Sequence, residues 1–183
     1  MITSHTLNMR RKQSGITLIE VSIGLIIAAI VAAAAFIAFQ NNARRTEVQD
    51  NIKQITEIIS ESKQKVGSTS GYTGLTTEIA AQLAILPADQ SGNALPNSYN
   101  AAVTLVGTDA DNATLTWTGV EADQCSDIVL AVSNGITAIT GTPTTGTGGT
   151  VAAVDGTLTL TQASTVCGDQ GAPVTLAMTF GRR

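Results

Sequence analysis

Residues 16–39 read ITLIEVSIGLIIAAIVAAAAFIAF, and this stretch decides how the whole chain is organised. Glu20 is its only charged residue. As a helix rising about 1.5 Å per residue, the run is about 36 Å long, enough to cross a hydrocarbon layer about 30 Å thick. A core helix of a soluble protein is rarely apolar on every face over such a length. The sequence therefore predicts a membrane-spanning helix near the N-terminus.

The remainder of the 183-residue chain differs sharply from this start in its charge. Charged residues make up 13% of the chain and aromatic residues 3%. Every Lys and Arg lies in residues 10–65 or at 182–183, so residues 66–181 carry no basic side chain. This pattern lacks the clustered basic surface of a nucleic-acid-binding protein, and we expect no contact with nucleic acid. It favours an acidic outward domain tethered to a membrane element.

Two ordinary fates of such an apolar run leave one feature unexplained. A cleaved secretory signal has an apolar region of about 7–15 residues, so this run is too long for one. A permanent anchor fits the length, and Arg10, Arg11 and Lys12 would keep its N-terminus cytoplasmic. Neither fate explains Glu20, since a carboxylate inside a membrane span costs about 2.5–3.5 kcal/mol on insertion scales. The run contains no Lys, Arg or His, so a positive partner must come from another chain or from processing.

The stretch GITLIEV at residues 15–21, after a short basic leader, resembles the class III signal of type IV pilins and pseudopilins. The resemblance implies that a prepilin peptidase cuts between Gly15 and Ile16 and methylates the new N-terminus of Ile16. It implies that Glu20 pairs with that amine on a neighbouring subunit, because two charges that are costly alone in lipid are less so together. A leader of fifteen residues from Met1 and the Ile at the first mature position favour the type IVb subgroup, although a start at Met9 would give a leader of seven residues.

The same resemblance implies an α+β pilin fold, in which a long N-terminal helix packs on an antiparallel β-sheet head. Apolar residues spaced by three and four continue the helix beyond residue 39 with one apolar face. We expect a leader at 1–15, a transmembrane and filament-core helix at 16–39, an amphipathic half at 40–66 and a head at 67–183.

Within the head, local patterns predict the order of the shorter elements. A helix is expected over 76–85, with Ile79, Leu83 and Leu86 on its packed side. Thr118 and Glu121 have the spacing of a capping box, which predicts a second helix that carries Cys125. Alternation and turn residues predict strands over 102–106, 113–118, 136–140, 151–161 and 173–180. We expect Trp117 to lie in the core.

Cys125 and Cys167 are the only two cysteines of the chain. In an exported domain two cysteines predict a disulfide, which stabilises a fold by about 2–4 kcal/mol. The arrangement is similar to the disulfide-bounded C-terminal region of type IV pilins.

The sequence offers no constellation for catalysis. It has no nucleophile–base pair or phosphate loop, and its one His, His5, lies in the expected leader. Asp109 and Asp111 suit a calcium site in residue type, but turn chemistry explains them better. We expect no metal, no cofactor and no enzymatic activity; the chain is a substrate of an enzyme.

Together these observations predict a structural subunit of a type IV pilus, which polymerises with copies of itself into a helical filament. The expected partners are the prepilin peptidase, the inner membrane and the pilus assembly machinery in it. The expected route runs from a single-pass inner-membrane precursor with a cytoplasmic N-terminus to an extracellular pilus for adhesion, attachment or mating contact. Two alternatives stay open: a pseudopilin or minor pilin of a type II secretion or DNA-uptake system, and a monomeric membrane-anchored extracellular binding module.

Overall fold

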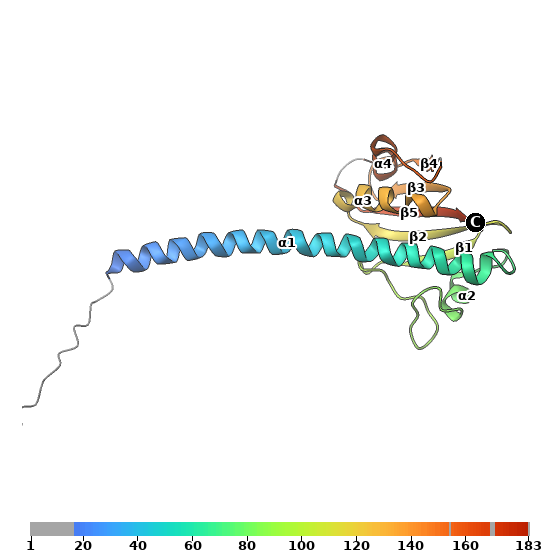
Figure 1. Ribbon diagram of the computed structural model, residues 1–183, viewed down its shortest axis with the longest axis horizontal. Helices are drawn as coiled ribbons and strands as arrows, with labels where there is room; N and C mark the ends of the chain where they lie inside the picture. Colours follow the sequence, from blue (N-terminus) through green and yellow to red (C-terminus); the bar gives the residue numbers. More distant parts are fainter. Residues whose placement is uncertain (1–16, 154, 169–170, 183) are drawn as a thin grey trace, which may run out of the picture. The chain divides into compact units, whose positions relative to one another are not determined.

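The computed structural model describes residues 17–153, 155–168 and 171–182. The leader and the predicted cleavage residues Gly15 and Ile16 lie outside these ranges. The chain forms two compact units that meet between Ala43 and Arg44, and each is described separately below. Helix α1 (Leu18–Ser62) supplies the described part of the first unit and continues into the second (Figure 1).

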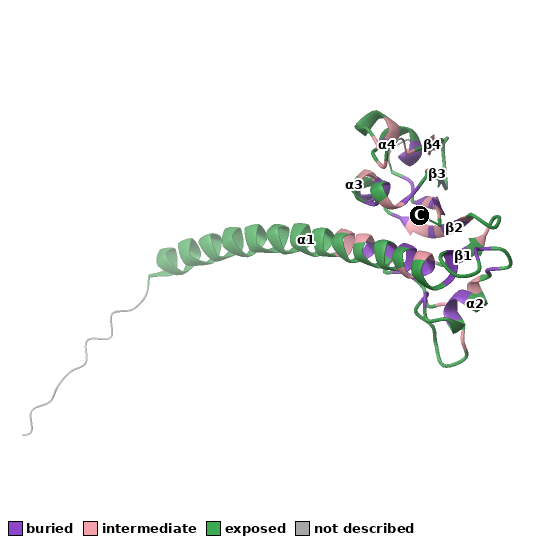
Figure 2. Cartoon of the chain, turned by 45° about the vertical axis from the view of Figure 1, so that its right-hand side comes forward, coloured by how far each residue is buried: buried purple, intermediate pink, exposed green. Residues whose placement is uncertain are grey.

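The described part of the first unit is helical from Leu18 onward, and nothing in it is buried. Every residue from 17 to 43 is exposed, and Figure 2 draws this half of α1 in green throughout. The exposed fraction of its large hydrophobic side chains runs from 49% at Val21 to 88% at Leu18. Its mean hydropathy reaches 2.7, and in the described part of the chain it is the one helix long and apolar enough to cross a membrane.

The second unit is built on a five-stranded sheet in which every neighbouring pair is antiparallel. The strand order is β1-β2-β5-β3-β4. The strands are β1 (Val103–Gly107), β2 (Asn112–Val120), β3 (Ala138–Pro143), β4 (Thr150–Ala152) and β5 (Val174–Gly181). Alternate residues face the core: in β5 the buried ones are Val174, Leu176, Met178 and Phe180. The predicted α+β head with an antiparallel sheet is confirmed.

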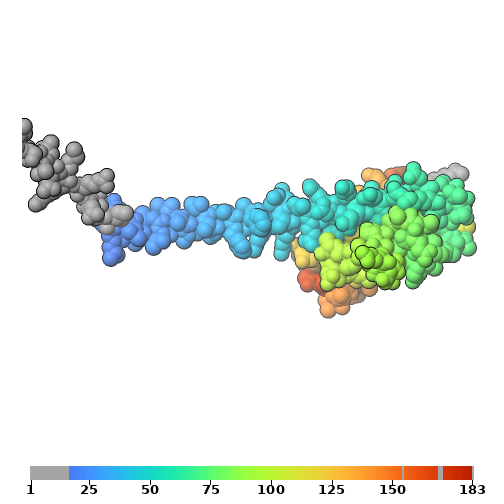
Figure 3. Space-filling view, turned by 90° about the horizontal axis from the view of Figure 1, so that it is seen from below, coloured from blue at the N-terminus to red at the C-terminus, as the bar shows by residue number. Residues whose placement is uncertain are grey.

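Helices cover the buried face of this sheet and close one core. After α1 come the π-helical turn η1 (Lys63–Gly67), α2 (Thr77–Gln82), α3 (Ala122–Val132), the 3-10 turn η2 (Ser133–Gly135) and α4 (Leu160–Cys167). Ile55, Ile58 and Ile59 of α1 share the core with the buried residues of the sheet. Trp117 is 1% exposed, which confirms its predicted place there. In Figure 3 the green segment that follows η1 lies along this part of α1.

The strand predicted over 151–161 is wrong. Strand β4 ends at Ala152, and helix α4 begins at Leu160. The Thr159 side chain accepts from the Gln162 N–H while the Gln162 side chain accepts from the Thr159 N–H, which is a complete capping box. Leu158 and Leu160 alternate in sequence, but Leu160 is 74% exposed and belongs to the helix. The capping box overrides the alternation.

The capping box predicted at Thr118 and Glu121 is also wrong, although the helix it announced is present. Thr118 belongs to β2, and Glu121 is the N-cap of α3 without a side-chain capping bond. Between Trp117 and Val120 the register of β2 against β5 shifts, and Gly119 has a φ of 84°, a conformation that glycine adopts without strain. The bulge takes up the residues that the pattern assigned to a helix start.

Helix α2 is shorter than predicted and packs through a different face. Ala80 and Ala81 are buried, whereas Ile79 and Leu83, two of the expected contacts, are 40% and 45% exposed; the third, Leu86, lies beyond the helix and is buried. The small alanine side chains let the helix approach the core closely, so its larger residues face outward.

Candidate assembly site

The described part of the predicted assembly site begins at Thr17 and contains Glu20. The Thr17 hydroxyl accepts a hydrogen bond from the Glu20 N–H at 3.3 Å. The Glu20 Oε2 atom accepts two bonds in return, from the Thr17 N–H at 3.0 Å and from the Thr17 hydroxyl at 2.9 Å. This is a capping box, and it satisfies two of the amides that a helix start leaves free. Glu20 is therefore tied to the start of α1.

The helix surface around and after Glu20 is apolar, and its exposure to water is unfavourable. Leu18 and Phe39, near the two ends of the run, are 88% and 71% exposed, and the hydrophobic residues between them are exposed as well. Removing apolar surface from water is worth about 25 cal/mol per Å², so a helix bare on every side strongly favours lipid or other apolar helices around it. Arg44 is the first basic residue after Glu20, so residues 18–43 contain no positive charge for the carboxylate.

In the second unit, a buried amide joins α1 to the sheet. Asn51 is 1% exposed and donates from Nδ2 to the Glu47 carbonyl at 2.8 Å. Its Oδ1 accepts from the Trp117 indole N–H at 3.1 Å and from the Ser98 hydroxyl at 2.9 Å. One side chain thus holds the helix, strand β2 and the loop before β1 in register, since each buried polar group needs its partner.

A second buried amide, Gln124 of α3, links α1 to Tyr99 and to Glu121, the residue just before α3. It donates from Nε2 to a carboxylate oxygen of Glu47 at 3.1 Å and of Glu121 at 3.4 Å, and its Oε1 accepts from the Tyr99 hydroxyl. Burial, with nearby Glu47 adding to the effect, raises the pKa of Tyr99 well above its ordinary value, so the phenol stays protonated as a donor. The surface pair of Arg44 and Asp123 adds a second link between α1 and α3.

Two lysines near the end of α1 satisfy the ends of other helices. Lys63 donates to the Gly135 carbonyl at 3.1 Å, where η2 ends. Lys65 donates to the carbonyls of Leu83 and Ala84, just after α2, at 3.1 and 3.0 Å. A cation at a helix C-terminus is favourable because the last carbonyls lack intrahelical partners. Burial lowers the pKa of Lys63 from its ordinary value.

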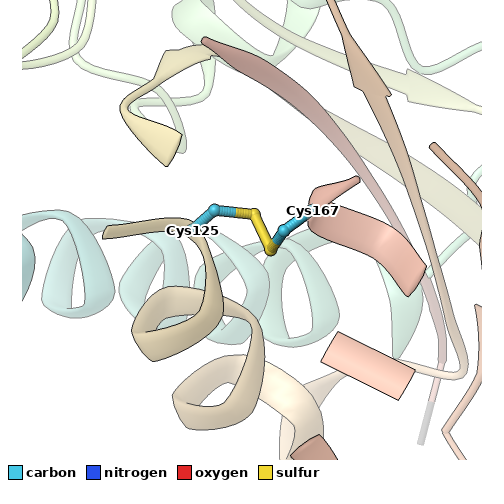
Figure 4. The surroundings of a disulfide bond; sticks show 2 residues. All are labelled: Cys125 and Cys167. Atoms are coloured by element: carbon cyan, nitrogen blue, oxygen red, sulfur yellow. A yellow bond between two sulfur atoms is a disulfide. The ribbon is translucent and has the colours of Figure 1, made fainter. Parts of the chain in front are cut away.

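Cys125 and Cys167 form the predicted disulfide, with their Cα atoms 5.8 Å apart. It joins α3 to the last residue of α4, as Figure 4 shows. Cys125 is wholly buried and Cys167 is 8% exposed, so the bond lies within the core. The disulfide fixes the C-terminal region of the head to the helix beneath it.

The acidic turn between β1 and β2 has the structure expected from turn chemistry. The Asp109 Oδ1 atom accepts from the backbone N–H groups of Asp111 at 2.7 Å and Asn112 at 2.8 Å. The Asn112 side-chain amide also donates to the Asp109 carboxylate. This bond, followed by the backbone bonds, lowers the pKa of Asp109. Across the described ranges no three His, Cys, Asp or Glu side chains lie close enough together to hold a metal ion.

The structure brings together some of the predicted site residues and adds others that were missed. The two cysteines meet, Glu20 contacts Thr17, and Gly15 and Ile16 lie outside the described residues. The Thr-x-x-Glu spacing of residues 17–20 is a sequence signal that could have identified the capping box. Asn51 and Gln124 gave no such signal, because their partners are far away in the chain; Trp117, for example, is 66 residues from Asn51.

Two family models match this chain. The family model "PilS N terminal" matches residues 45–180, and the model of the prokaryotic N-terminal methylation motif matches residues 10–36. Among solved structures, the chain is similar to TcpA, a type IV pilin of Vibrio cholerae El Tor biotype, at 16% identity and a TM-score of 0.49. That similarity covers 71% of this chain and 98% of the other. None of the curated proteins matches.

The two family matches divide the molecule as its structure does. The methylation motif covers the basic residues 10–12 and most of the apolar run, and the PilS match covers α1 from residue 45 onward together with the sheet and its helices. The PilS match alone takes in well over half of the sequence. The chain therefore belongs to the PilS family of type IV pilins.

Proposed function

We propose that this pilus subunit is made as a single-pass inner-membrane precursor, cut between Gly15 and Ile16 by a prepilin peptidase and methylated on Ile16. The methylation motif over residues 10–36 supports this proposal because it extends to both sides of that bond. Arg10, Arg11 and Lys12 support a cytoplasmic N-terminus, since basic residues beside a span stay on the cytoplasmic side. Residues 1–15 are the leader in this scheme.

After cleavage, residues 16–39 leave the bilayer for the core of a helical filament, while residues 40–66 and the head at 67–183 form its outer layers. One observation carries the proposal: every described residue up to 43 is exposed, whereas the second unit has a complete core of its own. The second unit buries its own apolar residues, and the apolar half of α1 requires apolar surroundings that lipid or other copies supply.

Glu20 is the residue that sets the subunit's place in the filament. Cleavage creates an ammonium group on Ile16, and in this scheme it pairs with Glu20 of a neighbouring copy. The filament is a type IVb-like pilus with this chain as its major subunit, and it serves adhesion, attachment or mating contact through the assembly machinery of the inner membrane. Membership of the pilin family does not favour the two alternatives, a pseudopilin or minor pilin and a monomeric anchored module.

The test is the intact mass and N-terminal sequence of protein sheared from the cell surface, together with filament counts for Glu20→Ala. We expect chains that begin at Ile16 with one added methyl group, and loss of filaments in the variant although the membrane still contains folded heads. Full-length, unmethylated chains, or normal filaments made by Glu20→Ala, would contradict the proposal.

A further inference from the structure

Two pairs of opposite charge along α1 and the turn η1 have the same spacing but differ in their bonds. Glu61 and Lys65 are four residues apart and form an ion pair at 3.0 Å. Lys53 and Glu57 are also four residues apart, and both are exposed, yet neither has a hydrogen bond or ion pair with any described residue. Their order explains the difference, because a Glu that precedes a Lys on a helix pairs better than a Lys that precedes a Glu. Lys53 and Glu57 therefore keep their charges available to another chain.

Glu57 lies on the wall of a groove between α1 and the segment that follows α2. The groove has a volume of about 480 Å³, and the buried side chains of Ile85 and Leu86 form part of its lining. Three charged residues line it, and two of them, Glu61 and Lys65, bond each other. Glu57 thus leaves the groove with one open negative charge, and the apolar lining suits the hydrocarbon stem of a basic side chain.

A cation that could enter this groove has few sources in a filament of identical copies. Residues 66–181 contain no Lys or Arg. Arg45 and Lys53 have no partner among the described residues. The other described basic residues of the second unit already bond within the chain: Arg44, Lys63, Lys65 and Arg182. A neighbouring copy therefore has two open cations to offer, both on α1.

Geometry favours Lys53 over Arg45. Lys53 and Glu57 lie on one face of α1, so a parallel copy displaced by about 6 Å along the helix brings its Lys53 level with Glu57. Arg45 would need a displacement of about 18 Å. The proposed pairing of Ile16 with Glu20 also joins residues four positions apart, in the same direction. The same displacement of four residues therefore fits both pairs.

We propose that the groove beside Glu57 is a contact site for a second copy of this chain, whose Lys53 enters it and pairs with the Glu57 carboxylate. This inference rests on the proposed assembly, because it uses parallel copies displaced by four residues. Every copy carries both residues, so each donates to one neighbour and accepts from another. Such a head-to-tail contact can repeat without closing, as a helical filament requires.

The first measurement is filament yield per processed subunit for two charge reversals, expressed separately and together. Lys53→Glu alone and Glu57→Lys alone each place like charges at the contact, so we expect each to lower the yield about tenfold. Co-expression should restore the yield to the wild-type level, because alternating copies then place opposite charges at every contact. Each variant chain keeps like charges at its own positions 53 and 57, so a defect within the chain would not be rescued.

Arg45→Glu and Asp50→Lys are the matched controls, since they make the same changes of charge at exposed residues of the same helix. Both should assemble like the wild type. The inference is overturned if the controls lose as many filaments as the two reversals, or if co-expression fails to rescue. Normal filaments from both reversals would also overturn it, and would leave the groove to a partner other than a pilus copy.

The second measurement is cross-linking in sheared filaments assembled from Lys53→Cys and Glu57→Cys copies together. The chain's own cysteines are both in the disulfide, so a short bis-maleimide reagent can join only the introduced thiols. We expect covalent dimers from the mixture and none from either variant alone. Filaments of the mixture without dimers would overturn the inference.

Glu20→Ala separates this contact from the pairing on which it rests. If Glu20→Ala makes no filaments and co-expression of the reversals gives no rescue, the proposed function stands and the role of Lys53 is refuted. If Glu20→Ala assembles normally and the reversals rescue each other, the groove contact stands and the pairing of Ile16 with Glu20 is refuted.

Discussion

Helix α1 has two halves that obey different physical rules although no break in the sequence separates them. Residues 17–43 are exposed throughout, while Ile55, Ile58 and Ile59 further along are buried in the head. Residues 18–39 carry apolar side chains on every face, with Glu20 as their one charge, whereas the second half of α1 is apolar on one face and charged on the others. Under the proposed assembly, polymerisation and folding depend on different stretches of one helix and can be changed separately.

The largest expected contrast between the halves comes from the same truncation made in each. Ile55→Ala removes a wholly buried side chain and should lower the free energy of unfolding of the head by about 2–5 kcal/mol. Ile37→Ala, at a side chain that is 60% exposed, should leave it unchanged. Denaturant unfolding of the full chain in detergent, followed by the fluorescence of the single Trp117, measures both. A similar loss in the two variants would mean that the halves fold as one unit.

The disulfide is the next largest contribution and belongs entirely to the second unit. Replacing both Cys125 and Cys167 by Ser should lower the free energy of unfolding by about 2–4 kcal/mol, because the bond limits the freedom of a long loop in the unfolded chain. The same unfolding experiment with a reductant supplies the control: it should bring the wild type toward the variant and leave the variant unaffected. A variant as stable as the oxidised wild type would show that packing alone holds α4 in place.

A smaller effect is expected from the amide that joins α1 to the sheet. Asn51→Ala leaves the Trp117 indole N–H and the Ser98 hydroxyl without their acceptor in a buried place, which should cost about 1–3 kcal/mol. Gln49→Ala, at an exposed residue two positions earlier, is the matched control and should change nothing. The Trp117 emission spectrum should shift only in the first variant, since only there does the indole lose a partner. An unchanged spectrum and stability would mean that water replaces the amide.

The features predicted correctly from sequence are those that depend on local pattern. The membrane-compatible run follows from composition alone, and strands β1, β2, β3 and β5 follow from alternation between turn residues. Trp117 and the two cysteines were assigned correctly because large aromatic residues and exported cysteine pairs have few other places in a fold.

The features that were missed depend on contacts between distant residues or on competition between local signals. Asn51 is polar and lies on a helix, and nothing near it in sequence shows that Ser98 and Trp117 will be its partners. The capping-box pattern occurs by chance in a chain rich in threonine, so Thr118 and Glu121 matched it without forming one. At Thr159 and Gln162 the pattern was genuine and was overlooked because alternating leucines suggested a strand.

The smallest predicted effect compares Thr159, which forms a capping box, with Thr118, which matches the pattern without forming one. Thr159→Ala removes the side chain that accepts from the Gln162 N–H and should cost about 0.5–2 kcal/mol, as N-cap losses do. Thr118→Ala, at the predicted but absent box, should cost less, because its side chain makes no hydrogen bond with the described residues and lies in a strand. The same fluorescence-detected unfolding of the full chain compares them.

Thr159→Ser should behave as the wild type, because serine caps a helix as well as threonine does. Which of the two alanine variants loses more free energy of unfolding shows whether the capping box at Thr159 determines where α4 begins. If Thr118→Ala is the more destabilising, helix α3 depends on a threonine that the structure assigns to β2, and the capping assignment of both helices is wrong. If Thr159→Ala is the more destabilising, a helix of only eight residues depends on its first side chain to begin where the alternation of its leucines would otherwise favour a strand.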